Sequence, residues 1–344
     1  MSGDEPTDEA MLRQIVAEAL TGVATGTLWA TARDLGWLAV GVAEQVGGSG
    51  GTVRDAAAIV RAAAATAPEL ALVEAMQASW LLGEAGWLDP DRDEPYAVAL
   101  PDPAETITLH TGLTGSATGV AGARTASALL VCAVAADDGR PVLARVDPAA
   151  DGLRVTPGTN LAGEPRDQVT VRGCVPLRVA MTAPHAADVR RRESLLRAAA
   201  LLGAVERTCQ LTVDHVRVRT QFGRPLLAQQ AVAHAVATMA GEREQCRAAL
   251  RGALDAWGGD HAASRVAAAR VIFGRAATTV ARLAHQLHGA VGITREHPLH
   301  RSTGRLLAWR DEPVATRTAS HTLGTVVAGG GDLWQWVVTD RIRS

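Results

Sequence analysis

One corner of the chain decides the fold, and it reads Arg219-Thr220-Gln221-Phe222-Gly223-Arg224-Pro225-Leu226. Apolar residues recur at helical spacing before it, over residues 194–218, and after it, over residues 232–250. Gly223 permits backbone angles that other residues resist, and Pro225 suits the first turn of a helix. The stretch is therefore predicted to join two long helices.

A turn alone accounts for neither Arg219 nor Phe222. The guanidinium group of arginine is planar and binds phosphate oxygens, and an aromatic ring offers a flat face for stacking. Together they match a ligand that carries both phosphate and a flat base. The corner is thus predicted to hold a nucleotide as well as to turn the chain.

The same corner resembles the C-terminal domain of the acyl-CoA dehydrogenase family. That family carries R-x-x-F-G-x-P-(Leu/Ile)-x-x-x-Q, followed by a helix that bears alanine and methionine. A run of residue types in this order is much more specific than a lone glycine motif. The matching residues here are Arg219, Phe222, Gly223, Pro225, Leu226, Gln230 and then Ala237-Thr238-Met239-Ala240.

Composition limits the partners and the compartment. A net charge of −2 across 344 residues gives no general reason to expect nucleic acid, and the basic residues, all of them arginine, are spread among acidic ones. The N-terminus shows neither a basic n-region nor an apolar h-region, and no apolar run is long enough for a membrane span. The four cysteines lie far apart, which predicts buried free thiols. We therefore expect a cytoplasmic protein with no membrane span and no nucleic-acid partner.

Changes in residue composition and in the spacing of apolar residues divide the chain into three parts. Residues 1–94 carry alanine-rich helical patterns and end in a charged, proline-bounded break. Residues 95–185 carry six short β-like runs punctuated by glycine, which predicts a small antiparallel barrel or sandwich. Residues 186–344 are helical again. Acyl-CoA dehydrogenases have the same order, so the resemblance implies an α+β fold, mostly α, with an N-terminal helical domain, a reduced middle β domain and a C-terminal four-helix bundle.

A second dense motif begins at Gln286 and ends at Arg301. Its glycines let the chain leave the α conformation at the end of a helix predicted over residues 261–288. The motif holds three histidines, but no pair stands at i,i+4 on one helix with a carboxylate partner, so no metal site is predicted. The resembled family reads Q-x-x-G-(G/A)-x-G-x-x-x-E-x-P-L-x-R here, and this chain keeps Gln286, Gly289, Gly292, Glu296, Pro298 and Arg301.

The resemblance implies that both motifs bind FAD. Residues in the positions of Arg219, Phe222 and Gln230 hold the nucleotide in the family. Those in the positions of Gln286 and of Gly289 and Gly292 lie near the FAD pyrophosphate of a neighbouring subunit, where backbone N–H groups can satisfy phosphate oxygens. A site shared between chains implies an oligomer, either of identical chains or of two different ones.

The resemblance also implies a reaction. Acyl-CoA dehydrogenases remove a proton from the carbon next to a thioester and pass hydride from the next carbon to flavin N5, which requires a carboxylate in a dry pocket. Family members place this glutamate either on the first long helix of the C-terminal bundle or after the second motif. Counting from the corner puts the first position on Glu193, and a one-residue shortening after the second motif puts the other on Glu312. We favour Glu312 as the base and keep Glu193 as the alternative.

The middle region departs from the family pattern. Ala99-Leu100-Pro101-Asp102-Pro103 replaces the family's T-E-P-x-x-G-S-D segment, and residues 115–123 hold no aromatic where the family places one beside the flavin. Three hypotheses follow. The first is a dehydrogenase of acyl-CoA or carrier-bound acyl thioesters that passes electrons to an electron-transfer flavoprotein. The second is a non-catalytic or flavin-sharing subunit that works with a paralogous partner, and the third is a flavin oxidase or monooxygenase on the same fold.

Overall fold

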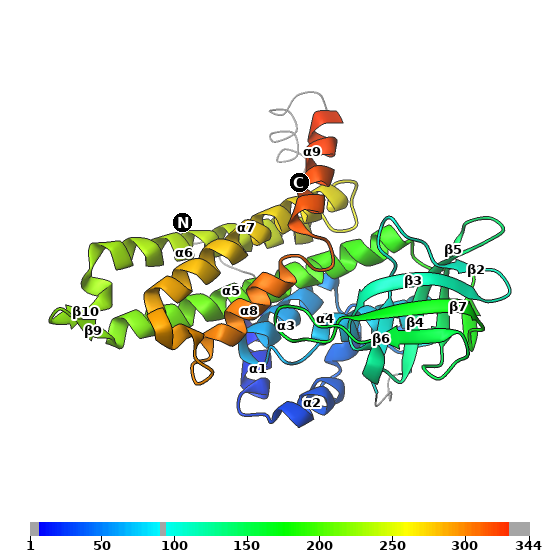
Figure 1. Cartoon of the computed structure of the whole chain (residues 1–344), viewed down its shortest axis with the longest axis horizontal. Helices are drawn as coiled ribbons and strands as arrows, with labels where there is room; N and C mark the ends of the chain where they lie inside the picture. The colour runs from blue at the N-terminus through cyan, green and yellow to red at the C-terminus, as the bar shows by residue number, and fades with distance from the viewer. Residues whose placement is uncertain (1–6, 90–93, 330–344) are drawn as a thin grey trace. The chain divides into compact units, whose positions relative to one another are not determined.

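The computed structural model describes residues 7–89 and 94–329 (Figure 1). The chain divides into two compact units, which we call unit 1 (Met1–Gly203) and unit 2 (Ala204–Ser344). The division falls inside one long helix, α5 (Ala186–Val218). Helices come first, then a β-sheet and then helices again, which is the α+β architecture expected from the sequence. The domain boundaries after residues 94 and 185 stay predictions.

Helices precede the sheet in unit 1. Helix α3 begins where the Thr52 side chain accepts a hydrogen bond from the Asp55 amide and the Asp55 carboxylate accepts one from the Thr52 amide, which is a capping box. The buried alanines of α3 leave room for neighbouring helices to approach closely. The bounds are α1 Thr7–Leu20, η1 Thr25–Thr27, α2 Leu28–Asp34, η2 Trp37–Ala39, η3 Glu44–Val46, α3 Val53–Thr66 and α4 Leu72–Glu84.

A curled sheet of eight strands follows in unit 1 (Figure 1). Its order is β6-β7-β3-β2-β4-β5-β8, with β1 beside β4. Neighbouring strands are antiparallel, except that β1 and β2 each run parallel to β4. The bounds are β1 Tyr96–Ala99, β2 Thr108–Leu109, β3 Leu113–Val120, η4 Ala123–Thr125, β4 Ala128–Ala135, β5 Pro141–Val146, β6 Leu153–Thr156, β7 Asp167–Cys174 and β8 Arg178–Ala180.

Strand β4 is buried on both faces. Leu129 and Val131 point into the core of the curled sheet, whereas the alternate residues Leu130 and Cys132 pack in a second cluster with Leu81 of α4. Side chains alternate between the faces of a strand, so a strand covered on both sides reads as an uninterrupted apolar run. This explains why residues 128–135 lack the polar alternation of a surface strand.

Long helices make up most of unit 2. Helices α6 and α7 pack against each other, and buried side chains such as Cys246, Leu250 and Phe273 fill the core between helices. Gly274 lets α9 approach α7, because a Cβ at residue 274 would lie 2.2 Å from Thr316 Oγ1. The bounds are β9 Thr220–Gln221, β10 Arg224–Pro225, η5 Leu226–Ala228, α6 Gln230–Asp255, α7 Ala262–His288, η6 Gly289–Ile293, α8 Leu299–Trp309 and α9 Thr316–Gly329.

All four cysteines are buried free thiols, which confirms that expectation. Cys132 and Cys174 lie in the sheet, and Cys209 and Cys246 lie on α5 and α6. Within the part of the chain that the structure describes, no helix combines the length and the apolar character that crossing a membrane requires.

Candidate active site

The corner is a two-stranded hairpin that follows the last turn of α5. Strands β9 and β10 pair Gln221 with Arg224, and the Leu226 amide donates to the Arg219 carbonyl at 2.8 Å. The two residues at the tip, Phe222 and Gly223, have φ angles of 54° and 77°. Two-residue hairpin loops favour this left-handed backbone, because its twist matches that of the flanking strands. The predicted turn between two long helices is confirmed.

The side chains predicted to bind a nucleotide are exposed on this hairpin and at the start of α6. The ring of Phe222 is 89% exposed, and the side chains of Arg219 and Gln230 are also exposed. A left-handed φ is costly for phenylalanine, and exposure of a large apolar ring is costly too. Backbone strain of this kind concentrates at functional sites. The corner thus presents a guanidinium group, an aromatic ring and an amide without packing any of them into the core.

The second motif starts where α7 ends. Gly289 has φ 63° and ψ −145°, a combination that is essentially restricted to glycine. A Cβ at Gly289 would meet nothing within 4 Å, so the backbone there faces open space. A Cβ at Gly292 would instead lie 2.8 Å from the Cβ of His288 and 2.9 Å from Leu299 Cδ2. Gly289 is therefore required by its backbone angles, and Gly292 is required by close packing against His288 and Leu299. We call residues 289–293 the glycine turn.

The corner and the glycine turn lie at the same end of unit 2. The rings of His215, in the last turn of α5, and His288, in the last turn of α7, stack at 4.3 Å between centroids and 22° between planes. The ring of His297 meets His288 edge-on at 4.8 Å. Arg219 follows His215 by one helical turn, and Gly289 directly follows His288. Two motifs far apart in the sequence are thus joined by a histidine stack that the sequence did not predict.

The histidine stack is not arranged as a metal site. Among residues 7–89 and 94–329, no group of three or more His, Cys, Asp or Glu side chains could hold a metal ion. His288 bonds through Nδ1 to the carbonyl of Ala284 at 2.8 Å, and His285 bonds through Nε2 to Thr303 Oγ1 at 2.8 Å. These nitrogens are engaged within the protein itself.

Glu312 lies in the connection between α8 and α9, which a buried arginine fixes. Arg270 of α7 is 1% exposed, and its Nη2 lies 3.0, 2.7 and 2.8 Å from the carbonyl oxygens of Trp309, Arg310 and Glu312. The last carbonyls of a helix have no partner within it, and a cation can satisfy them. The Glu312 side chain is half-buried. Its backbone is thus held in place by the core of unit 2.

Glu193 lies in unit 1, on the first half of α5, and Arg190 of the preceding turn lines a cavity of about 310 Å³. The cavity lies between the loop after β1, the strands β4 and β5 and the start of α5, and its lining includes Asp102, Cys132 and Arg190. Burial raises the pKa of the Cys132 thiol to about 12, with Arg190 opposing the shift and Glu193 adding to it. Arg190 Nη2 donates to the carbonyl of Pro101. Glu193 therefore interacts electrostatically with two residues of the cavity lining, Cys132 and Arg190.

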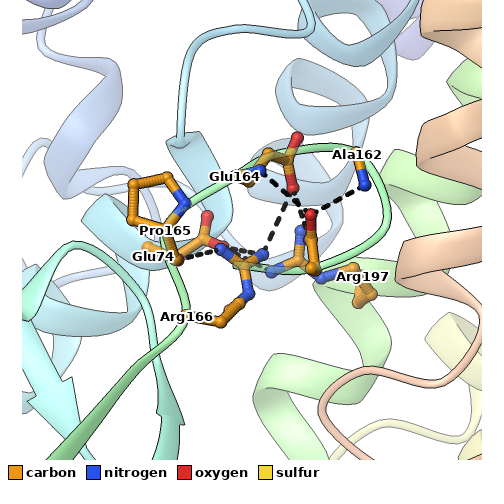
Figure 2. Close-up of polar contacts among 7 residues, drawn as sticks. Glu74, Ala162, Glu164, Pro165, Arg166 and Arg197 are labelled. Atoms are coloured by element: carbon orange, nitrogen blue, oxygen red, sulfur yellow. Dashed lines mark hydrogen bonds and ion pairs between the residues drawn. The ribbon is translucent and has the colours of Figure 1, made fainter. Parts of the chain in front are cut away.

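An ion network in unit 1 holds the loop between β6 and β7 against α4 and α5. Glu74 pairs with both Arg166 and Arg197 (Figure 2). Their Nη2 atoms lie 3.2 and 2.5 Å from Glu74 Oε1. Arg166 also lies 3.4 Å from Glu164. Burial raises the pKa of Glu74, but the charges of Arg197 and then Arg166 outweigh it and bring the pKa to about 2. Sequence reasoning missed this network, although single charges inside the apolar helical runs of α4 and α5 were a usable signal.

Comparison with known proteins places the chain in a set of related sequences. A family model described as "Acyl-CoA dehydrogenase, C-terminal domain" matches residues 191–310. Acyl-CoA dehydrogenase FadE28 of Mycobacterium tuberculosis is 30% identical over 342 residues, covering 86% of this chain and 91% of that protein. Acyl-CoA dehydrogenase IpdE2 of the same organism is 37% identical over 107 residues, and this match spans 31% of the chain and only 32% of that relative.

Solved structures share the fold. The ChsE4-ChsE5 complex from Mycobacterium tuberculosis contains a chain that superimposes with a TM-score of 0.84 at 24% identity, covering 95% of this chain and 99% of that one. A structure of PigA with FAD and proline superimposes with a TM-score of 0.82 at 18% identity, covering 96% of this chain and 100% of that one. At these identities the likeness is one of fold.

Proposed function

The chain belongs to the acyl-CoA dehydrogenase family, and on this basis we propose that it is a FAD-dependent dehydrogenase of acyl thioesters. The proposed reaction is α,β-desaturation of an acyl group carried by CoA or by a carrier protein. FAD, when bound, supplies the hydride acceptor. An electron-transfer flavoprotein is the proposed partner that removes the electrons.

The proximity of the corner to the glycine turn carries this proposal. Through the His215–His288 stack, both stretches lie at one end of unit 2. The exposed guanidinium of Arg219 suits phosphate, and the exposed ring of Phe222 suits a flat base. The open space at Gly289 leaves room for a ligand to approach the backbone. These features fit the nucleotide part of FAD.

Two glutamines, Gln286 and Gln230, complete the set of residues that we propose to bind FAD. Both amides are exposed, Gln286 in the last turn of α7 and Gln230 in the first turn of α6. We propose that Arg219, Phe222, Gln230, Gln286, Gly289 and Gly292 hold one FAD together at this end of unit 2, and that a neighbouring chain completes the site. The protein would then be an oligomer.

We propose Glu312 as the base that takes the proton from the α-carbon. Its half-buried side chain projects from a backbone that Arg270 holds, and a base needs a fixed position relative to the proton it removes. Glu193 remains the alternative because it interacts electrostatically with Cys132 and Arg190, which line a cavity. However, Arg190 is one of its charged neighbours, and a nearby cation stabilises the ionised carboxylate and so weakens it as a base.

Amide substitutions separate the two carboxylates. Glu312→Gln should retain FAD, measured by flavin absorbance, and lose the bleaching of that absorbance on addition of an acyl-CoA. Asp311→Asn changes the exposed neighbour and is the matched control, which should keep both properties. Normal bleaching in Glu312→Gln would reject Glu312, and loss of bleaching in Glu193→Gln alone would move the role to Glu193.

A second candidate function is a flavin-sharing subunit that is active only with a paralogous chain. Two observations favour it: strand β3 carries no aromatic residue for the flavin ring, and a solved relative in fold is described as a complex of two different proteins. If the chain purified alone lacks flavin and gains it on co-expression with a paralogue, this candidate is supported. Flavin and bleaching in the chain alone would reject it.

A further inference from the structure

We propose that His288 and His215 are a positioning pair that holds the glycine turn beside the corner, and that they do so only while both rings are neutral. The inference rests on the proposed function of the corner and the glycine turn as the nucleotide site. It adds a dependence of nucleotide binding on pH, and it assigns that dependence to two side chains.

Hydrogen bonding fixes the orientation of His288. A carbonyl oxygen only accepts, so Nδ1 of His288 carries the proton that is donated to Ala284 at 2.8 Å. Nε2 is then bare in the neutral ring. It is buried, and it has no hydrogen-bond partner among the described residues. A second proton would place an N–H group at Nε2 where no acceptor is in reach, which is costly for a buried group.

His288 also packs directly against the backbone of the glycine turn. A Cβ built on Gly292 would lie 2.8 Å from the Cβ of His288 and 3.5 Å from its Cγ. The backbone of Gly292 therefore rests directly on His288, whose side chain is only 5% exposed. The ring of His288 also stacks on the ring of His215, which belongs to the last turn of α5. The turn, the stack and the corner thus form one continuous packed path.

The charged groups that face the stack are basic. His288 is faced by His215, His297 and His285, and His215 is faced by His297 and Arg219. Burial, together with the neighbouring histidines, lowers the pKa of His288 to about 4, and the hydrogen bond to the Ala284 carbonyl opposes this shift. Burial also lowers the pKa of His215, with His297 and Arg219 acting in the same direction. Protonating both stacked rings would set two like charges in contact, so acid should separate α5 from the glycine turn.

The experiment compares FAD binding by apoprotein at several pH values. For the wild type, the dissociation constant should rise about tenfold or more between about pH 8 and about pH 5. His288→Phe keeps a stacked ring but takes no proton, so its dissociation constant should change by less than about threefold over that range. His321→Phe alters an exposed histidine of α9 and should behave as the wild type. A slope in His288→Phe equal to that of the wild type would overturn the proposal.

A second measurement separates this proposal from the proposed function. Amide hydrogen exchange of residues 289–293 is followed in FAD-free protein, with rates corrected for the intrinsic effect of pH. His288→Ala should speed exchange in the glycine turn, whereas His321→Phe should not. If the wild type binds no FAD either alone or with a paralogous chain, the proposed function fails, and the exchange data still test the positioning pair. Unchanged exchange in His288→Ala would reject the positioning role.

Discussion

At the scale of single residues, Phe222 combines two unfavourable features. Its backbone has a φ of 54°, which L-residues other than glycine, asparagine and aspartate rarely adopt, and its ring is 89% exposed. Glycine would suit the turn better, and a polar residue would suit the surface better. The fold of the free chain thus does not account for Phe222, which is consistent with its proposed role in binding a nucleotide.

Replacing Phe222 tests that explanation. Phe222→Gly should raise the free energy of unfolding of the apoprotein by about 0.5–1 kcal/mol, because glycine relieves the strain of the left-handed backbone. The same change should weaken FAD binding, because the ring is lost. Phe222→Leu keeps the strain and loses the aromatic face, so it should weaken binding without the gain in stability. Urea unfolding and FAD titration measure the two effects, and full affinity in Phe222→Gly would contradict the account.

Sequence patterns identified the surface residues of the site better than the buried ones. Arg219 and Phe222 stood out because a simple turn needs neither. His215 and Arg270 gave no comparable signal, since their roles depend on contacts with residues distant in the chain. Arg270 is one of four arginines in α7, so the sequence alone does not single it out. Position along the sequence does not reveal such partners.

At the scale of elements, strand prediction succeeded where side chains favoured strands. The bounds of β5 and β6 agree with the apolar and β-branched runs in the sequence. Strand β3 was missed because it reads LTGSATGV, in which glycines and small residues weaken the pattern. Gly115 is needed there for packing, since a Cβ would lie 2.7 Å from the Thr106 carbonyl oxygen. This strand is therefore stabilised by its pairing with β7 rather than by an intrinsic preference of its residues for β structure.

The ion network that joins α4, α5 and the β6–β7 loop predicts how stability depends on pH. The pKa of Glu74 is about 2 in the folded chain, below its ordinary value of 4.5. Its contribution to stability is therefore fully present above about pH 4.5 and is lost as pH falls toward 2. Glu74→Gln should lower the free energy of unfolding at neutral pH by about 2–4 kcal/mol, because it removes the carboxylate that pairs with the buried Arg197 and with Arg166.

The control for this prediction is Glu244→Gln, which alters an exposed ion pair on α6. It should change stability by less than about 1 kcal/mol. Urea unfolding at neutral pH and at about pH 3 measures both variants, and the Glu74 variant should lose less stability on acidification than the wild type. Equal losses in the Glu74 variant and the wild type would show that other carboxylates control the acid limit.

At the scale of the whole molecule, the order of helices, sheet and helices could be predicted from residue composition, from the spacing of apolar residues and from the two family motifs. The choice of the catalytic carboxylate could not. Glu193 and Glu312 belong to different units, and counting along the sequence places both near a family position. The proximity of the corner to the glycine turn could not be predicted either, because it involves contacts between residues far apart in the chain, such as the stack of His215 on His288.

The most direct test of the central claim is FAD affinity with and without the guanidinium of Arg219, in the chain alone or with the partner that it requires for flavin. Arg219→Gln should raise the dissociation constant for FAD by about tenfold or more, because it removes a charged bond to phosphate. Arg224→Gln removes an exposed arginine from the same hairpin and is the matched control, with less than about threefold change expected. Wild-type affinity in Arg219→Gln would contradict the assignment of the corner as the nucleotide site.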